Sequence, residues 1–168
     1  MSEGRIVDVF VEIPTGSANK YEYDKAKGRF VLDRVLYSPM FYPADYGFVE
    51  GTLAEDGDPL DALVLTTYPT FPGCIIPARV VGALLMRDDK GQDEKLIAVP
   101  AVDPRFAEIR TIDDLPAHKR KEIAHFFQVY KDLENKKTEI QGWIGPDEAE
   151  RLLEAAVARY REQAKVGI

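Results

Sequence analysis

Short runs of alternating or continuous apolar residues fill the first two-thirds of the chain, a pattern typical of β-strands. Several runs are rich in Val and Ile, and Gly, Pro and Asp residues separate them. Lys27-Gly28 and residues 88–91 supply turn chemistry for two hairpins. The pattern predicts strands over residues 5–13, 20–24, 30–36, 62–67, 75–86 and 94–99, with a short extended piece near Phe48.

The last third of the chain is predicted to be helical, apart from a short strand over residues 138–143. Apolar residues recur at helical spacing over residues 123–133, behind Pro116, which suits the first position of a helix. A second apolar stripe covers residues 149–160 and follows an acidic start, which the positive end of a helix favours. Strands first and helices afterwards predict the α+β class, with an antiparallel sheet or small closed barrel and two main helices packed outside.

The composition is that of an ordinary globular domain, with 168 residues, 45% hydrophobic and 30% charged. A net charge of −7 repels nucleic acid and anionic membranes, so neither is an expected partner. Cys74 is the only cysteine, which excludes an intrachain disulfide and a thiolate-rich zinc site. The sequence shows neither a secretory signal nor an apolar run of about 20 residues, so a cytoplasmic location is expected.

The strongest chemical signal is the acidic string EDGDPLD at residues 55–61. A solvated acidic turn is one explanation, and a cation site is the other. Gly57 and Pro59 restrict the backbone, and a predicted strand follows at once, which favours the cation site. Oxygen ligands select Mg²⁺, Mn²⁺ or Ca²⁺ over Zn²⁺. A helix-loop-helix calcium loop does not fit, because Leu60 stands where an oxygen ligand is needed.

Further acids and bases accompany this string, although each has a plain explanation by itself. Asp88, Asp89 and Asp93 belong to a predicted turn, and Glu12 and Glu22 belong to predicted strands. Carboxylates beside cationic and phenolic groups are the inventory that phosphoryl transfer needs. The basic and phenolic candidates are Lys20, Arg34, Lys95, Lys131, Tyr42, Tyr46 and Tyr130.

Taken in order, these blocks resemble the family I soluble inorganic pyrophosphatases of bacterial type, over nearly the whole chain. The resemblance implies a single domain over residues 1–168 with an OB-like barrel, which hydrolyses pyrophosphate with Mg²⁺, or Mn²⁺ as a substitute. It also implies a homohexamer of two stacked trimers. The matching blocks are VEIP at Val11, KYEYDK at Lys20, LDR ending at Arg34 (VDR in the family), MFYPADYG at Met40, DGDPLDA at Asp56, GxxxMxDxxGxDxK over 82–95, KLIAVP at Lys95 and AHFFxxYKDLE at Ala124.

Carried over to matching positions, the resemblance makes Asp58 the general base. It assigns one Mg²⁺ to Asp56, Asp61 and Asp93, lets Asp61 face a second ion, and gives Asp88 and Asp93 an ion that arrives with substrate. Glu12 supports a further ion and Glu22 completes the metal-binding set. Asp89 stands where relatives often carry Glu and is left out of that set. The implied substrate-binding residues are Lys20, Arg34, Tyr42, Tyr46, Lys95, Tyr130 and Lys131.

Two other classes of protein compete with this interpretation. A haloacid-dehalogenase phosphatase would need an apolar strand running directly into the DxD string, but TLAE precedes it. A small acidic β-barrel without catalysis could bind nucleic acid through strand aromatics, but the chain lacks a basic stripe. Neither His118 nor His125 is expected to bind metal, and His125 is either a solvated helix residue or part of a subunit contact. Cys74 is expected to have no chemical role.

Overall fold

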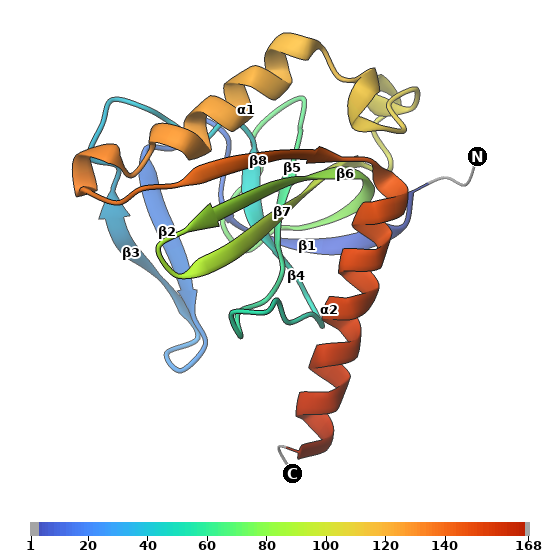
Figure 1. Ribbon diagram of the computed structural model, residues 1–168, viewed down its shortest axis with the longest axis horizontal. Coiled ribbons are helices and arrows are strands. Elements are labelled where there is room, and N and C mark those ends of the chain that lie inside the picture. The colour runs from blue at the N-terminus through green and yellow to red at the C-terminus, as the bar shows by residue number, and fades with distance from the viewer. Residues whose placement is uncertain (1–3, 167–168) are drawn as a thin grey trace.

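The computed structural model describes residues 4–166 and contains a closed ring of five strands (Figure 1). Neighbours pair in the order β1-β4-β5-β7-β6, and β6 pairs again with β1. The ring therefore has no free edge between its first and last strands, which confirms the expected small barrel. An additional strand, β8, pairs with β6 outside the ring. The strands are β1 (Ile6–Ile13), β4 (Asp45–Val49), β5 (Asp61–Val64), β6 (Ile75–Asp88), β7 (Gly91–Pro100) and β8 (Glu139–Ile144).

The longest strand, β6, belongs to two parts of the sheet at once. Its first residues pair with β1 and its last residues pair with β8. The register of β6 against β7 shifts at Gly82, where a Cβ atom would lie 2.5 Å from both Ile112 and Ile144. Glycine is therefore required where the strand bends. The expectation of a purely antiparallel barrel needs one correction, because β5 and β7 are parallel.

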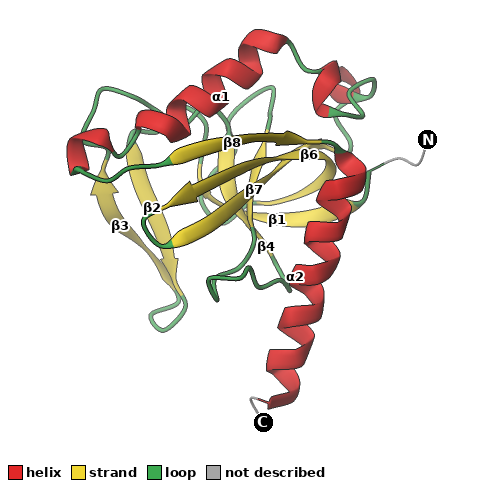
Figure 2. Ribbon diagram, in the orientation of Figure 1, coloured by secondary structure: helices red, strands yellow, loops and turns green. Residues whose placement is uncertain are grey.

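The predicted hairpin near the N-terminus is confirmed as β2 (Asn19–Asp24) and β3 (Arg29–Val35). These strands pair only with each other among the strands of residues 4–166, and they stand beside the barrel (Figure 2). Phe10 of β1 lies 5.2 Å from Tyr23 and 5.7 Å from Phe30, measured between ring centroids. Aromatic packing of this kind attaches the hairpin to the barrel.

Both predicted helices are present as α1 (Ala117–Val129) and α2 (Pro146–Val166). Phe126 and Phe127 of α1 enter one apolar cluster, and Leu153 of α2 enters a second. Neither helix is long and apolar enough to cross a bilayer, within the described part of the chain. Short 3₁₀ turns precede and follow α1 at η1 (Pro104–Phe106), η2 (Ile112–Asp114) and η3 (Asp132–Glu134).

The ends of the helices differ in detail from the predicted apolar stripes. Pro116 precedes the first helical residue and does not open the helix. Leu133 lies in η3, beyond the end of α1, and is 62% exposed. Tyr160 is 45% exposed, because α2 continues past the barrel at this point (Figure 1). The spacing of apolar residues predicts which face of a helix is apolar, but it does not show where the helix stops packing against the barrel.

Candidate active site

Lys95 lies at the centre of a carboxylate cluster and is only 1% exposed. Its Nζ donates to Asp61 Oδ2 at 3.0 Å, to Asp93 Oδ2 at 3.0 Å and to Tyr46 Oη at 2.8 Å. The strand register explains this geometry, since Asp61 of β5 is directly opposite Lys95 of β7, and Asp93 lies two residues away on the same face. Burial opposes the charge of Lys95, but these acidic neighbours outweigh it and hold the pKa of Lys95 above its usual value.

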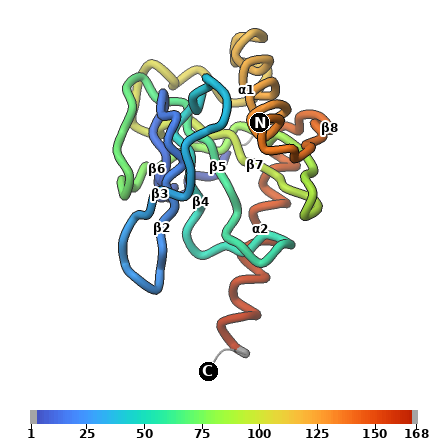
Figure 3. The backbone as a smooth tube through the Cα atoms, turned by 90° about the vertical axis from the view of Figure 1, so that its left-hand side faces the viewer, coloured from blue at the N-terminus to red at the C-terminus, as the bar shows by residue number. Residues whose placement is uncertain are grey.

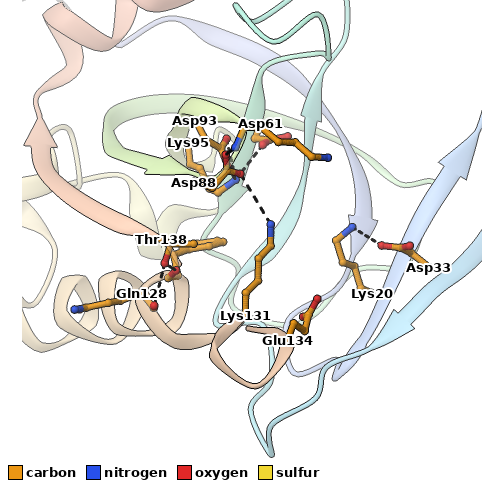
Figure 4. A network of polar contacts seen from close by, with 12 residues as sticks. Lys20, Asp33, Asp61, Asp88, Asp93, Lys95, Gln128, Lys131, Glu134 and Thr138 are labelled. Atoms are coloured by element: carbon orange, nitrogen blue, oxygen red, sulfur yellow. Dashed lines mark hydrogen bonds and ion pairs between the residues drawn. The ribbon is translucent and has the colours of Figure 1, made fainter. Parts of the chain in front are cut away.

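A second acid–base pair lies beside this cluster, between the end of β6 and the turn after α1. Asp88 Oδ2 is 3.9 Å from Lys131 Nζ, and Figure 4 shows Lys131 pointing toward the carboxylates. Burial lowers the pKa of Lys131, although Asp88 opposes that shift. Burial also raises the pKa of neighbouring Tyr130 to about 12. Lys131 is therefore a half-buried cation directed into the same region as Asp61 and Asp93.

The β2–β3 hairpin contributes two more cations, each already held by a carboxylate. Lys20 and Arg34 are cross-strand partners in the hairpin. Lys20 Nζ donates to Asp33 Oδ2 at 2.8 Å, and this bond is the main reason why the pKa of Asp33 is lowered. Arg34 is shared between Asp33 and Glu134, whose side chain is only 6% exposed. Figure 4 shows Lys20 and Asp33 at the side of the site that faces Lys131.

The first residues of the acidic string, 55–58, are exposed in the loop between β4 and β5, and the string ends at Asp61 in β5. The backbone N–H of Asp58 donates to Asp56 Oδ1 at 3.0 Å, and Gly57 between them adopts a φ of +88°. Although Asp58 is exposed, its partial desolvation raises its pKa, and Asp56, Glu22 and Asp93 add to that shift through their negative charge. The loop thus brings Asp58 within electrostatic range of carboxylates from the hairpin and from β7.

Glu12 completes the acidic side of the site from β1. Its carboxylate accepts a hydrogen bond from the backbone N–H of Tyr23 at 2.9 Å. Burial raises the pKa of Glu12 to about 7, with a further contribution from the Asp61 carboxylate, while the Tyr23 bond opposes the shift. The Asp61 carboxylate is therefore one of the charges that act on Glu12.

Tyr42 and Tyr46 line the apolar side of this region, 5.4 Å apart between ring centroids. Burial raises the pKa of both phenols, so they remain neutral hydrogen-bonding groups. Asp89 is exposed, as are His118 and His125, and Cys74 is half-buried. The structure thus assigns none of these last four to the carboxylate cluster.

Two residues in the site have no place in the sequence interpretation, namely Asp33 and Glu134. Their only signal was position: Asp33 precedes Arg34, and Glu134 ends the YKDLE block. Sequence alone does not distinguish them from solvated acids, because Lys20, the partner of Asp33, lies on the other strand of the hairpin and Arg34, the partner of Glu134, lies 100 positions away. Contacts of this length are visible only in the folded chain.

The donor set of the site consists of carboxylates, which suit a hard cation such as Mg²⁺. Within residues 4–166, no three acidic, His or Cys side chains are arranged as a ready metal-binding group. Asp61 and Asp93 instead share the ammonium of Lys95. Mg²⁺ keeps several water ligands and needs only one or two protein carboxylates, so the residues present still fit it.

Comparison with known proteins shows the family to which this chain belongs. Residues 9–161 match the Pyrophosphatase family, described as inorganic pyrophosphatase. The chain is 63% identical over 161 residues to the inorganic pyrophosphatase of Geobacillus stearothermophilus, with 96% of this chain and 98% of that protein covered. It is 53% identical over 165 residues to that of Methanosarcina acetivorans, with 98% of each covered. The crystal structure of the Thermus thermophilus inorganic pyrophosphatase matches with a TM-score of 0.91 and 50% identity, covering 93% of this chain and 91% of that chain.

Proposed function

Because this chain belongs to the inorganic pyrophosphatase family and hydrolyses pyrophosphate, we propose that Asp58 is the general base and Mg²⁺ the cofactor of that reaction. Members of this family use divalent metal ions. Pyrophosphate is highly anionic, so it repels an attacking hydroxide, and phosphate is a poor leaving group. The site must therefore neutralise charge on the substrate and remove a proton from water.

The cations of the site are suited to the first task. Arg34 offers a planar fork that matches two phosphate oxygens, and Lys20 and Lys131 act as point charges. Carboxylate neighbours hold each of them before substrate binds. In the low-dielectric interior, such preorganised groups stabilise charge on the leaving phosphate more strongly than water does. The proposed substrate-binding set is Lys20, Arg34, Tyr42, Tyr46, Lys95, Tyr130 and Lys131.

Carboxylates would hold the metal ions, and Mn²⁺ would substitute for Mg²⁺ because both prefer oxygen ligands. When bound, Mg²⁺ lowers the pKa of a water molecule and cancels charge on phosphate oxygens. Lys95 orients Asp61 and Asp93, because its ammonium donates hydrogen bonds to both carboxylates as well as to Tyr46. The proposed metal-binding set is Glu12, Glu22, Asp56, Asp61, Asp88 and Asp93.

The single observation that best supports this proposal is that carboxylates and cationic side chains from different elements meet in one site. Figure 4 shows Asp61, Asp88 and Asp93 gathered near Lys95, with Lys131 and Lys20 across from them. Arg34 is held beside Lys20 by Asp33 and Glu134. Partial burial and the negative charges of nearby acids raise the pKa of Asp58, which suits it to accept a proton. A non-catalytic acidic barrel is not supported, because the relatives are named as enzymes.

The test is phosphate release from pyrophosphate with Mg²⁺ and with chelator, for the wild-type chain and for Asp58→Asn. We expect turnover to require the cation and to fall by about 10²–10⁴ in the variant, the usual contribution of a general base. Asp89→Asn is the matched control, because Asp89 is a nearby exposed acid outside the proposed set. Full turnover in chelator, or an unimpaired Asp58→Asn, would refute the mechanism.

We also propose that the chain assembles as a homohexamer in the cytoplasm, on its resemblance to bacterial members of the family. His125 lies on the exposed side of α1 and is a candidate contact between subunits. Sedimentation of the wild-type chain and of His125→Glu tests this, with a smaller species expected for the variant. A wild-type monomer at micromolar concentration would contradict the assembly.

A further inference from the structure

Helix α2 holds the acidic loop at a place outside the proposed site. The backbone N–H of Leu53 donates to the carbonyl oxygen of Ala156 in α2 at 3.0 Å. Arg159, one turn further along the helix, donates from Nη1 to the carbonyl oxygen of Leu53 at 3.2 Å. Its other terminal nitrogen lies 3.6 Å from Glu55 Oε1. In Figures 1 and 3, the loop after β4 runs beside α2, in agreement with these contacts.

The position of Arg159 follows from the packing of α2. Ala149, Leu153 and Ala156 are fully buried against the barrel, at helical spacing. Arg159 comes three residues after Ala156 and therefore lies on the same face of the helix, where it contacts the loop after β4. A guanidinium can donate to a carbonyl and a carboxylate at once, because its N–H groups form a rigid fork. Arg159 thus joins two points of the loop to one point of the helix.

Inside the loop, a compact turn connects these anchored residues to the carboxylates. The N–H of Ala54 donates to the carbonyl of Asp58 at 2.7 Å, and the N–H of Gly57 donates to the carbonyl of Ala54 at 3.1 Å. The backbone N–H of Asp58 in turn donates to Asp56 Oδ1 at 3.0 Å. Ala54 lies between Leu53 and Glu55, the two residues that Arg159 contacts. The direction in which Asp58 points therefore depends on how α2 holds this turn.

We propose that Arg159 is a positioning residue for pyrophosphate hydrolysis. It acts through Leu53 and Glu55 on the carboxylates of Asp56 and Asp58, and it does not touch the substrate. The inference rests on the proposed role of Asp58 as general base. Residues 55–58 are exposed, so water competes with the bonds inside the turn. The anchor on α2 restricts the loop, and small displacements of a catalytic group reduce turnover.

The experiment compares Arg159→Gln with Arg161→Gln, an exposed arginine two residues further along α2. For Arg159→Gln we expect kcat to fall about three- to tenfold with little change in KM for pyrophosphate. Arg159→Lys should recover part of the loss, since a lysine can still reach one acceptor. Arg161→Gln should match the wild-type chain.

Hydrogen exchange separates positioning from general stability. Arg159→Gln should speed amide exchange in the segment 50–60 and leave exchange in β6 and β7 unchanged. Loss of protection throughout the barrel would mean a purely structural role and would overturn the inference. So would an Arg159→Gln chain that equals Arg161→Gln in both kcat and exchange.

Asp58→Asn assayed in parallel distinguishes failure of this inference from failure of the proposed function. An inactive Asp58→Asn beside a normal Arg159→Gln refutes only the positioning role. An unimpaired Asp58→Asn refutes the general base, and the positioning role fails with it.

Discussion

Glu12 illustrates, at the scale of a single residue, how burial converts an ordinary carboxyl into a pH-dependent group. Its pKa is raised from 4.5 to about 7, with burial as the main cause and the Asp61 carboxylate adding to it. The folded chain therefore binds this proton more tightly than the unfolded chain does. In linkage terms, the contribution of Glu12 to stability is greatest below pH 4.5 and is lost as the pH rises through about 7. Above that pH, an uncompensated Glu12 destabilises the fold.

We predict that Glu12→Gln stabilises the chain at pH 8 in chelator, by roughly 2–3 kcal/mol. Glutamine keeps an acceptor for the Tyr23 N–H but carries no charge to desolvate. The gain should be mostly lost at pH 5, where the wild-type carboxyl is protonated in the folded state. Urea denaturation at both pH values measures it, with the exposed Glu50→Gln as control. An equal gain at both pH values would show that charge is not the cause.

Residue types alone identified the acidic string, because closely spaced carboxylates around Gly57 and Pro59 are informative without any fold. Residue types made Lys95 only a basic candidate, the family resemblance assigned it to the site, and neither showed that it is buried against Asp61 and Asp93. Burial of a lysine depends on neighbours from other strands, and a hydropathy pattern does not supply them. Asp33 and Glu134 were missed for the same physical reason, since their significance comes from contacts with cations.

At the scale of elements, the hairpin is a separate unit that carries Lys20 and Arg34. It has no backbone pairing with the barrel strands among the described residues. Aromatic packing around Phe10 attaches it on one side. Arg34 and Glu134 connect it on the other side to η3, the turn that follows α1. The distance between the hairpin cations and Lys131 therefore depends partly on this ion pair.

We predict that Glu134→Gln lowers kcat/KM for pyrophosphate by about tenfold or more, since hydrogen bonds to charged groups are worth roughly 1.5–3 kcal/mol. In an Arg34→Ala background, the same substitution should have little further effect. Steady-state kinetics of the four chains in this double-mutant cycle measure the coupling. Asp132→Asn, an exposed change in the same turn, serves as control. Additive losses would show that Glu134 acts independently of Arg34.

Element types were predictable because each depends on local spacing and turn residues. The hairpin at Lys27-Gly28 and the stripe that includes Phe126 and Phe127 are examples. Strand direction was not predictable in the same way. The β5–β7 pair is parallel because β6 returns the chain to the same end of the barrel, which is a property of the route between strands. The apolar pattern of a strand is the same whether the strand pairs parallel or antiparallel to its neighbour.

At the scale of the whole molecule, the net charge of −7 opposes binding of an anion. The fold offsets this repulsion locally, because it brings together Lys20, Arg34 and Lys131 from segments that are distant in sequence. On the other side of the site, Asp61 and Asp93 share one lysine, so two negative charges face one positive charge. This imbalance leaves the assembled site attractive to a cation.

The proposed cation site would form only in the folded chain, so Mg²⁺ should stabilise the fold through mass action. A ligand at 100 times its Kd adds about 2.7 kcal/mol when it binds only the native state. We therefore predict that Mg²⁺ raises the Tm of chelator-treated protein in thermal unfolding, and that Asp61→Asn reduces this rise. Asp89→Asn should respond like the wild-type chain. Because salt also screens repulsion between exposed acids, NaCl at equal ionic strength is the decisive control. If NaCl reproduced the whole rise, general screening would account for it, and the carboxylates around Lys95 would not be a specific cation site.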